Sequence, residues 1–310
     1  MSKNLFGFLV IDKPKGMTSH DCVKRMRKVL GIKRIGHGGT LDPSVTGVLP
    51  IAIGNATRLL TFLPSKKKYR GVIQLGKTTF TDDLEGEVIA EYQLPKLSIK
   101  IIERNLENFI GAIKQKPPVI SSIHIQGERA YTRARRGESL ILPSREVIID
   151  ELQLINWNEQ LGQIEIDIKC SSGTYIRSLA RDIGNKLNCG GCLASLRRTE
   201  SLGFKEQDSF SLPEINVEID LVYKQIITPQ KCLEHLPFFR LNSEGECLKW
   251  RTGSQLEITT SRIKKPKENY SIKKDFKPIV VIGQTGEVEG IAAGDNSSIL
   301  TPKIVFNAKG

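Results

Sequence analysis

The chain has 310 residues, of which 39% are hydrophobic, and carries a formal net charge of +12 at pH 7. This length and apolar content indicate a globular protein with at least one sizeable core and room for a second domain. The early apolar run from Leu5 to Ile11 is broken at once by Asp12 and Lys13. We therefore expect neither a membrane span nor a secretory signal, and we expect a cytoplasmic protein.

Short apolar runs and amphipathic segments follow one another along the first two thirds of the chain. We predict strands over residues 8–11, 48–53, 72–75, 88–92 and 164–170, and helices over residues 19–30, 98–110 and 175–187. The two kinds of element do not alternate strictly, as they would in a parallel α/β sheet. The pattern predicts an α+β fold with a mainly antiparallel sheet.

The predicted helix over residues 19–30 has an apolar face and a basic face. Thr18 or Ser19 is suited to cap its start, and Gly31 is suited to end it. Its inner face carries Val23, Met26, Val29 and Leu30, and its basic side chains, expected to face outward, are Lys24, Arg25, Arg27 and Lys28. Residues 1–34 hold nine lysines and arginines against two aspartates, so more than half of the net charge lies there.

Two further basic clusters contain aromatic side chains. Residues 66–70 read Lys-Lys-Lys-Tyr-Arg, and Arg133, Arg135 and Arg136 lie near Tyr131 in the sequence. Cations interleaved with aromatic rings are typical of nucleic-acid contact. A solvated basic face remains the alternative for any single cluster, whereas three clusters together favour a polyanionic partner.

The segment from Gly36 to Gly47 surrounds Asp42 with four glycines and a proline. Glycine permits positive φ and close approach, and Pro43 forces the residue before it into an extended conformation. The loop is expected to hold Asp42 in one position, either as a reactive carboxylate or as the cap of the next element. It has neither the ending of a phosphate-binding loop nor the spacing of a dinucleotide fingerprint, so we expect no nucleotide cofactor.

Cys189-Gly190-Gly191-Cys192 is the one C-x-x-C motif in the sequence. A structural zinc site needs four ligands, and no second such pair accompanies it. No thioredoxin-like strand and helix pattern surrounds it, which argues against a redox dithiol. We expect no metal, and reduced thiols throughout.

Several motifs in order along the chain resemble the TruB-type tRNA pseudouridine synthases. They cover most of the first two thirds of the sequence: Ile11 to Ser19, His37 to Arg58, Lys68 to Arg70, Leu75 to Gly86, Ser172 to Leu179 and Leu196 to Arg198. The resemblance implies a catalytic domain of pseudouridine-synthase type, with a mixed, mainly antiparallel sheet, over residues 1–235. It also implies a small β-rich, PUA-like RNA-binding domain over residues 236–310, which includes an exposed lysine-rich loop at 262–277.

By this resemblance the protein isomerises uridine to pseudouridine in tRNA, at uridine 55 of the T-loop, after flipping the base. It implies no cofactor, the tRNA T-arm as partner, no obligatory protein partner and a monomer. The same reaction on another structured RNA is the alternative within enzymes. A tRNA-folding chaperone or a ribonucleoprotein component are alternatives of other classes.

Three residues are expected to carry the chemistry. The resemblance places the catalytic carboxylate at Asp42, an arginine that pairs with it at Arg177, and a tyrosine that lines the base pocket and takes part in proton transfer at Tyr69. The expected geometry is a bidentate pair, in which two guanidinium nitrogens of the arginine donate to the carboxylate. The chain departs from the family pattern at Phe80 and at Ile120 to Ser122, and we expect neither departure to touch these three residues.

Four further residues are expected to bind the substrate. Tyr175 would stack on the flipped base and Leu196 would supply an apolar wall. His37 would fill the gap left by the flipped nucleotides. Lys13 belongs to the first motif, whose expected task is to support the loop that carries the carboxylate.

Overall fold

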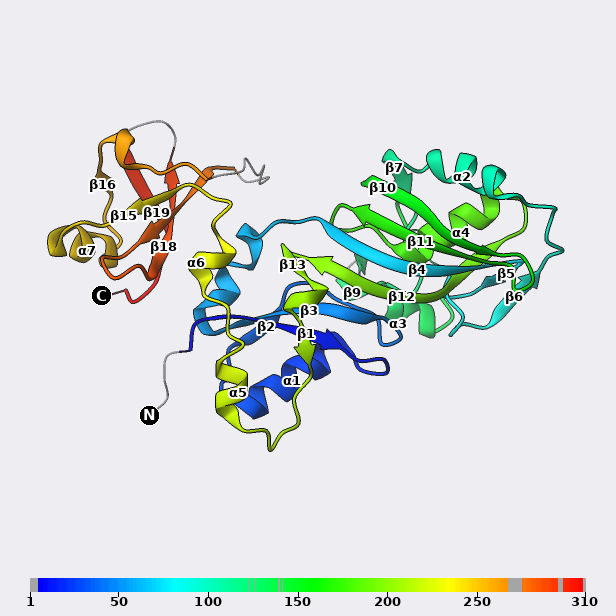
Figure 1. The fold of residues 1–310 in the computed structure, drawn as a ribbon, viewed down its shortest axis with the longest axis horizontal. Coiled ribbons are helices and arrows are strands. Elements are labelled where there is room, and N and C mark those ends of the chain that lie inside the picture. Colours follow the sequence, from blue (N-terminus) through cyan, green and yellow to red (C-terminus); the bar gives the residue numbers. More distant parts are fainter. Residues whose placement is uncertain are drawn as a thin grey trace.

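The computed structural model describes residues 5–121, 123–125, 127–138, 140, 142–266, 275–294 and 298–308. Two β-sheets lie toward opposite ends of the molecule, with helix α6 (Pro229–Cys232) between them (Figure 1). Half of the loop predicted at 262–277, namely residues 267–274, lies outside the described residues.

The main sheet contains ten strands within the described residues. These are β1 (Gly7–Lys13), β2 (Ile35–His37), β3 (Thr46–Ile53), β4 (Lys67–Leu75), β7 (Gly111–Gln115), β10 (Arg145–Asn158), β11 (Gln163–Cys170), β12 (Gly191–Ser201), β13 (Phe204–Lys205) and β14 (Phe210–Ser211). Their order is β14-β1-β3-β12-β4-β11-β10-β7, with β2 paired to β3 and β13 to β12. The β1/β14 and β3/β12 pairs are parallel and the others antiparallel, which confirms the predicted mixed, mainly antiparallel sheet.

The remaining elements flank this sheet. Two small hairpins are β5 (Lys77–Thr79) with β6 (Val88–Glu91), and β8 (His124–Ile125) with β9 (Glu128–Arg129). The helices before α6 are α1 (Ser19–Leu30), α2 (Ile99–Glu107), α3 (Ala130–Arg135), α4 (Ile176–Lys186) and α5 (Ile219–Tyr223). Short 3₁₀ turns are η1 (Gly54–Arg58), η2 (Leu60–Phe62), η3 (Glu206–Asp208) and η4 (Thr260–Arg262).

Helix α1 begins and ends where the sequence predicts. Thr18 is the cap: its hydroxyl accepts from the backbone of Asp21, whose carboxylate accepts in return from the Thr18 backbone. Gly31 ends the helix with φ of +65°. The outward-facing expectation fails for two basic side chains, because Arg25 donates to the carbonyl of Pro213 and Arg27 to that of Ile35.

The core that positions the site lies between α2, α4 and one face of the sheet. Apolar side chains of β4 and β11, such as Ile73 and Ile166, pack in one cluster with Leu179 and Ile183 of α4 and with Ile102 of α2. All five side chains are completely buried. This packing fixes α4 against the sheet and so fixes the arginine near its start.

The second sheet is formed by residues after His235. Its order is β15-β17-β18-β19-β16, with β15 (Phe238–Arg240), β16 (Leu256–Glu257), β17 (Lys277–Ile282), β18 (Val288–Gly294) and β19 (Ile299–Val305), and helix α7 (Glu244–Arg251) packs beside it. The two sheets share one apolar cluster, in which Phe306 and Val280 meet Phe8 and Leu59. The small β-rich C-terminal unit is therefore confirmed, and it is joined to the main sheet through a buried junction.

Candidate active site

Asp42 lies in the loop between β2 and β3, with its backbone anchored on both sides. Before it, Leu41 is buried, and its N–H donates to the Ser19 hydroxyl at 2.8 Å. After it, the carbonyl of Pro43 accepts from the Gly16 N–H at 2.8 Å and from the Lys13 ammonium at 3.2 Å. The Asp42 side chain itself remains 41% exposed. The loop thus presents a carboxylate that is fixed in position and open to a ligand.

Lys13 supports this loop from beneath. Its side chain is completely buried, and its ammonium donates to the carbonyls of Pro14 and Met17 as well as Pro43, at 2.7 to 3.2 Å. Burial lowers the pKa of Lys13, and the nearby Asp42 charge opposes that shift. Its ammonium therefore contacts three backbone carbonyls, one of which, that of Pro43, lies directly after Asp42. Substrate binding by Lys13 stays a prediction.

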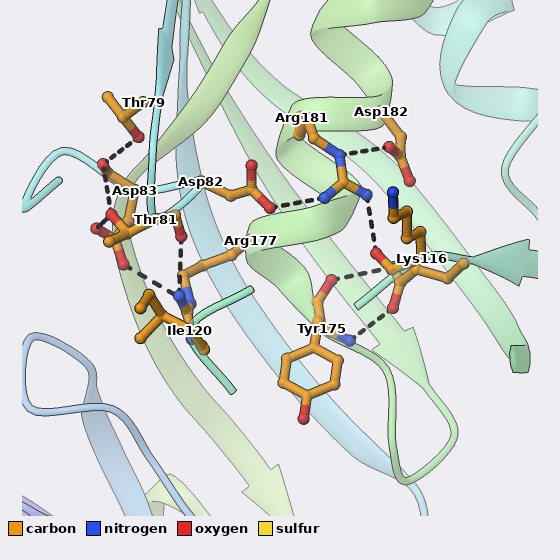
Figure 2. Close-up of polar contacts among 11 residues, drawn as sticks. Thr79, Thr81, Asp82, Asp83, Lys116, Ile120, Tyr175, Arg177, Arg181 and Asp182 are labelled. Atoms are coloured by element: carbon orange, nitrogen blue, oxygen red, sulfur yellow. Dashed lines mark hydrogen bonds and ion pairs between the residues drawn. The ribbon is translucent and has the colours of Figure 1, made fainter. Parts of the chain in front are cut away.

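Arg177, in the first turn of α4, forms the ion pair with Asp42. The distance from its Nε to Asp42 Oδ2 is 3.0 Å, and the arginine side chain is only 7% exposed. The expected two-nitrogen fork is wrong. Its terminal nitrogens instead donate to the backbone carbonyls of Thr81 and Ile120, at 2.8 and 2.9 Å (Figure 2). Arg177 therefore ties three segments together, and its Nε is the nitrogen that forms the ion pair with the carboxylate.

These two carbonyls correct a second expectation. The departure at Ile120 to Ser122 does touch Arg177, because the Ile120 carbonyl accepts a hydrogen bond from it. The other carbonyl belongs to Thr81, the residue after Phe80. The side chain of Phe80 is 46% exposed. A backbone contact tolerates any side chain, which explains how the sequence can depart there without changing the arginine's position.

Tyr69 extends from β4 and is buried beside Arg198 of β12. Burial raises the pKa of Tyr69, and the positive charge of Arg198 partly opposes this. Arg198 is completely buried, and it also donates to the carbonyls of Val48 and Gly39, at 2.8 and 3.1 Å. This arginine therefore joins the Tyr69 strand to the loop that carries Asp42. The sequence motif contained Arg198, but its role was not predicted.

Tyr175 and Leu196 flank this centre. The Tyr175 backbone is fixed by the buried amide of Gln115, which it contacts at 2.9 and 3.0 Å, and its ring points away from the helix (Figure 2). The guanidinium of Arg145 lies over that ring, 4.5 Å from its centroid. Leu196 is partly buried and packs on the core under the sheet.

His37 ends strand β2, directly before the Asp42 loop. Its Nδ1 accepts from the Gly39 N–H at 3.3 Å, which leaves the Nε2 nitrogen as the protonated one in the neutral ring. Burial, with the positive charge of Arg198, lowers the pKa of His37, so the ring is neutral at pH 7. The structure thus places Asp42, Arg177, Tyr69 and His37 around one loop.

Comparisons with known proteins identify the family. A family model described as TruB family pseudouridylate synthase (N terminal domain) matches residues 27–176, and one described as tRNA pseudouridylate synthase B C-terminal domain matches residues 177–231. The tRNA pseudouridine synthase B of Prochlorococcus marinus strain MIT 9313 is 50% identical over 317 residues, covering 98% of this chain and 99% of that one. The chain belongs to the TruB family of pseudouridylate synthases.

Other TruB relatives match over nearly the full length. The tRNA pseudouridine synthase B of Synechococcus sp. strain WH7803 is 49% identical over 308 residues, covering 98% of each chain. Among solved structures, a chain of the crystal structure of a Cbf5-Nop10-Gar1 complex superposes with a TM-score of 0.71, covering 97% of this chain and 84% of that one. At 24% identity the structural likeness shows the fold alone.

The segment from Thr81 to Gly86 is part of the TruB resemblance, but no role was predicted for its acidic residues. Asp83 lies 3.7 Å from the Arg177 Nε and is 14% exposed, so Arg177 stands between two carboxylates. Asp82 pairs with Arg181, one helical turn further along α4, at 2.7 Å (Figure 2). Burial raises the pKa of Asp82 to about 6. The sequence did hold a signal for these ion pairs. Asp82 and Asp83 are adjacent, and Arg177 and Arg181 are spaced four residues apart in a predicted helix, as on one helical face.

The cysteine pair borders the acidic segment beside Arg177, because the backbone of Leu193, directly after Cys192, is hydrogen-bonded to Asp82 and Leu84. Cys189 and Cys192 are buried free thiols, and burial raises the pKa of Cys192 to about 11. In the part of the chain that the structure describes, no group of three His, Cys, Asp or Glu side chains could hold a metal ion. No helix among the described residues is long and apolar enough to cross a bilayer.

Proposed function

We propose that this TruB-family enzyme isomerises uridine 55 in the T-loop of tRNA to pseudouridine. The observation that carries the proposal is the half-exposed Asp42 carboxylate, held by an anchored loop and contacted by the buried Arg177 at 3.0 Å. Relatives that match nearly the whole chain at about 50% identity bear the name tRNA pseudouridine synthase B.

The reaction requires a carboxylate next to the ribose. The bond from C1′ to N1 breaks, the base turns over, a bond from C1′ to C5 forms, and the hydrogen on C5 leaves while N1 gains one. Atoms and electrons balance within one nucleotide, so the net reaction needs no oxidant and no group donor. Asp42 acts on the sugar in this scheme, either by attacking C1′ or by removing a ribose proton while the base is detached.

The base would be held by aromatic and apolar side chains. A flipped base stacks between such groups, and Tyr69 and Leu196 lie on the neighbouring strands β4 and β12. With its pKa raised by burial, Tyr69 is a neutral phenol at pH 7. A neutral phenol can stack beneath a base. It can relay the C5 proton by giving its own hydroxyl proton to solvent as its oxygen accepts the proton from C5. Tyr175 and His37 are proposed to contact the bound RNA.

Residues 236–310 are proposed to extend the RNA contact as a second domain. They carry twelve lysines and arginines against eight acids, a net charge of +4. The remaining 235 residues keep +8 and all of the proposed catalytic groups. The expectations of a monomer and of a cytoplasmic location remain predictions.

Pseudouridine mapping in unmodified tRNA transcripts tests the proposal. The transcript is incubated with the protein alone, and pseudouridine is located by chemical adduct formation and reverse transcription. We expect modification at position 55, and none in a transcript with cytidine there. Modification confined to other positions or other RNAs would favour the alternative substrate. Faster tRNA refolding without any pseudouridine would favour the chaperone.

A further inference from the structure

Three consecutive lysines lie at the start of strand β4, and they have different surroundings. Lys66 pairs with Asp150 at 2.7 Å, and Lys68 lies 3.9 Å from Glu200. The Lys67 backbone pairs with Cys170 and Ser201 in the sheet, whereas its ammonium has no ion-pair or hydrogen-bond partner among the described residues. In the sequence the three lysines form one basic cluster. In the fold Lys66 and Lys68 are paired with acids, and of the three only Lys67 has no acidic partner among the described residues.

Lys67 faces the proposed active site. It precedes Tyr69 by two residues in the same strand, so both side chains lie on one face of the sheet. A β-carbon added to Gly39 would lie 3.4 Å from the Lys67 Nζ and 3.5 Å from the Arg198 Nη1. Two cations therefore converge on the loop backbone three residues before Asp42.

These converging charges repel one another. Burial lowers the pKa of Lys67 to about 8, and the Arg198 charge contributes to the decrease, while the thiol of Cys170 on β11 opposes it. Burying cations without a counter-charge is costly, so a bound anion at such a position is stabilising. Asp42 does not neutralise them, since its carboxylate is paired with Arg177.

The anion best suited to this position is an RNA phosphate. A ribose held at Asp42 carries its phosphates within the same nucleotide, and the Lys67 ammonium lies against Gly39 of the loop that holds this carboxylate. We propose that Lys67 binds a backbone phosphate of the flipped target nucleotide, an inference that rests on the proposed pseudouridine synthase activity. Tyr69 would then hold the base and Lys67 the backbone from neighbouring positions of one strand.

Matched neutral variants of the three lysines test this inference. Lys67→Gln should weaken tRNA binding about tenfold and lower the slope of log affinity against log salt by about 0.7. Lys66→Gln and Lys68→Gln remove the same charge from ion-paired positions and should change affinity less than about threefold. Lys67→Arg should restore most of the binding.

A pH series separates a phosphate contact from a structural role. The Lys67 ammonium loses its proton as pH rises through about 8, so wild-type affinity should fall there, and the Lys67→Arg variant should show no such fall. Cys170 titrates higher, near 11, and the neutral His37 and the charged Arg198 do not change over this range.

Three results would overturn the inference. The first is equal affinity and salt slope for Lys67→Gln and Lys68→Gln. The second is a lowered melting temperature with lost binding in Lys67→Arg as well as Lys67→Gln, which would indicate a structural lysine. The third is a wild-type affinity that does not fall as pH rises through 8, or that falls equally in Lys67→Arg. Failure of the proposed function is distinguishable, because it would appear as absence of pseudouridine with the wild-type protein.

Discussion

Replacing Arg177 by lysine keeps the charge but removes the geometry that the structure assigns to it. The guanidinium uses three nitrogens in three directions: toward Asp42 at 3.0 Å, Thr81 at 2.8 Å and Ile120 at 2.9 Å. A lysine has a single nitrogen, which cannot reach all three acceptors. If the ammonium stays near Asp42, both backbone carbonyls lose their donor.

The magnitude follows from those contacts. A hydrogen bond involving a charged group contributes about 1.5 kcal/mol or more, so losing two costs about 3 kcal/mol of unfolding free energy. For a chain of this size that lowers the melting temperature by roughly 6 to 12 °C. Asp42 also loses the contact that orients it, and a misplacement of about 1 Å reduces the chemical rate about 100-fold.

The assay measures single-turnover release of tritium from C5 of labelled uridine in tRNA, together with thermal unfolding. Arg181→Lys is the matched control, since Arg181 lies one turn along α4 and also has three partners, Asp82, Asp182 and the Lys116 carbonyl, none of which is Asp42. The control should lose stability and keep its rate within a few-fold. Near-normal turnover by Arg177→Lys, or equal losses in both variants, would refute the reasoning.

Three further predictions concern the supports of the site. Lys13→Met should lower kcat with little change in KM, because it frees the Pro43 carbonyl beside Asp42; an unchanged kcat in steady-state assays would contradict this. The pKa of Asp82 is about 6 in the folded protein against an ordinary value of 3.8, so ionising Asp82 lowers the free energy of unfolding by about 3 kcal/mol. This contribution is fully present below pH 3.8 and is lost as pH rises through 6. Asp82→Asn should flatten that fall in urea titrations across the same pH interval, and a pH dependence equal to wild type would exclude the effect. Truncation after His235 should raise KM for full-length tRNA more than it lowers kcat, and should lower the melting temperature by exposing the shared apolar cluster; an unaltered KM and melting temperature would show that this unit contributes to neither.

The sequence predicted elements whose signal is local. The helix at residues 19–30 has its cap, apolar face and terminal glycine in one short segment, and the structure has it as Ser19–Leu30. Strand β12 (Gly191–Ser201) was not predicted, although it lies beside β3 and β4 at the centre of the sheet. Its alternation is hidden because Arg198, a charged residue, is one of its completely buried positions. A buried cation looks like a surface residue until its carbonyl partners are known.

The same limit applies to the site. The ion pair of Asp42 with Arg177 was implied by the family motifs and is present. The contacts of the Arg177 side chain with the carbonyls of Thr81 and Ile120 were not foreseeable. These acceptors lie 96 and 57 residues away in the sequence, and a backbone carbonyl is present whatever the side chain of its residue. Likewise, nothing in the sequence separates Lys67 from the lysines on either side of it.

The Asp42→Asn variant tests the central claim most directly. Asparagine keeps the size of the side chain and removes its charge, so tRNA should bind within about tenfold of wild type, a difference of roughly 1.4 kcal/mol. With tRNA saturating, tritium release from C5 of uridine 55 should be abolished. Appreciable release by this variant, with deamidation to aspartate excluded by mass spectrometry, would contradict the assignment of Asp42 as the catalytic carboxylate.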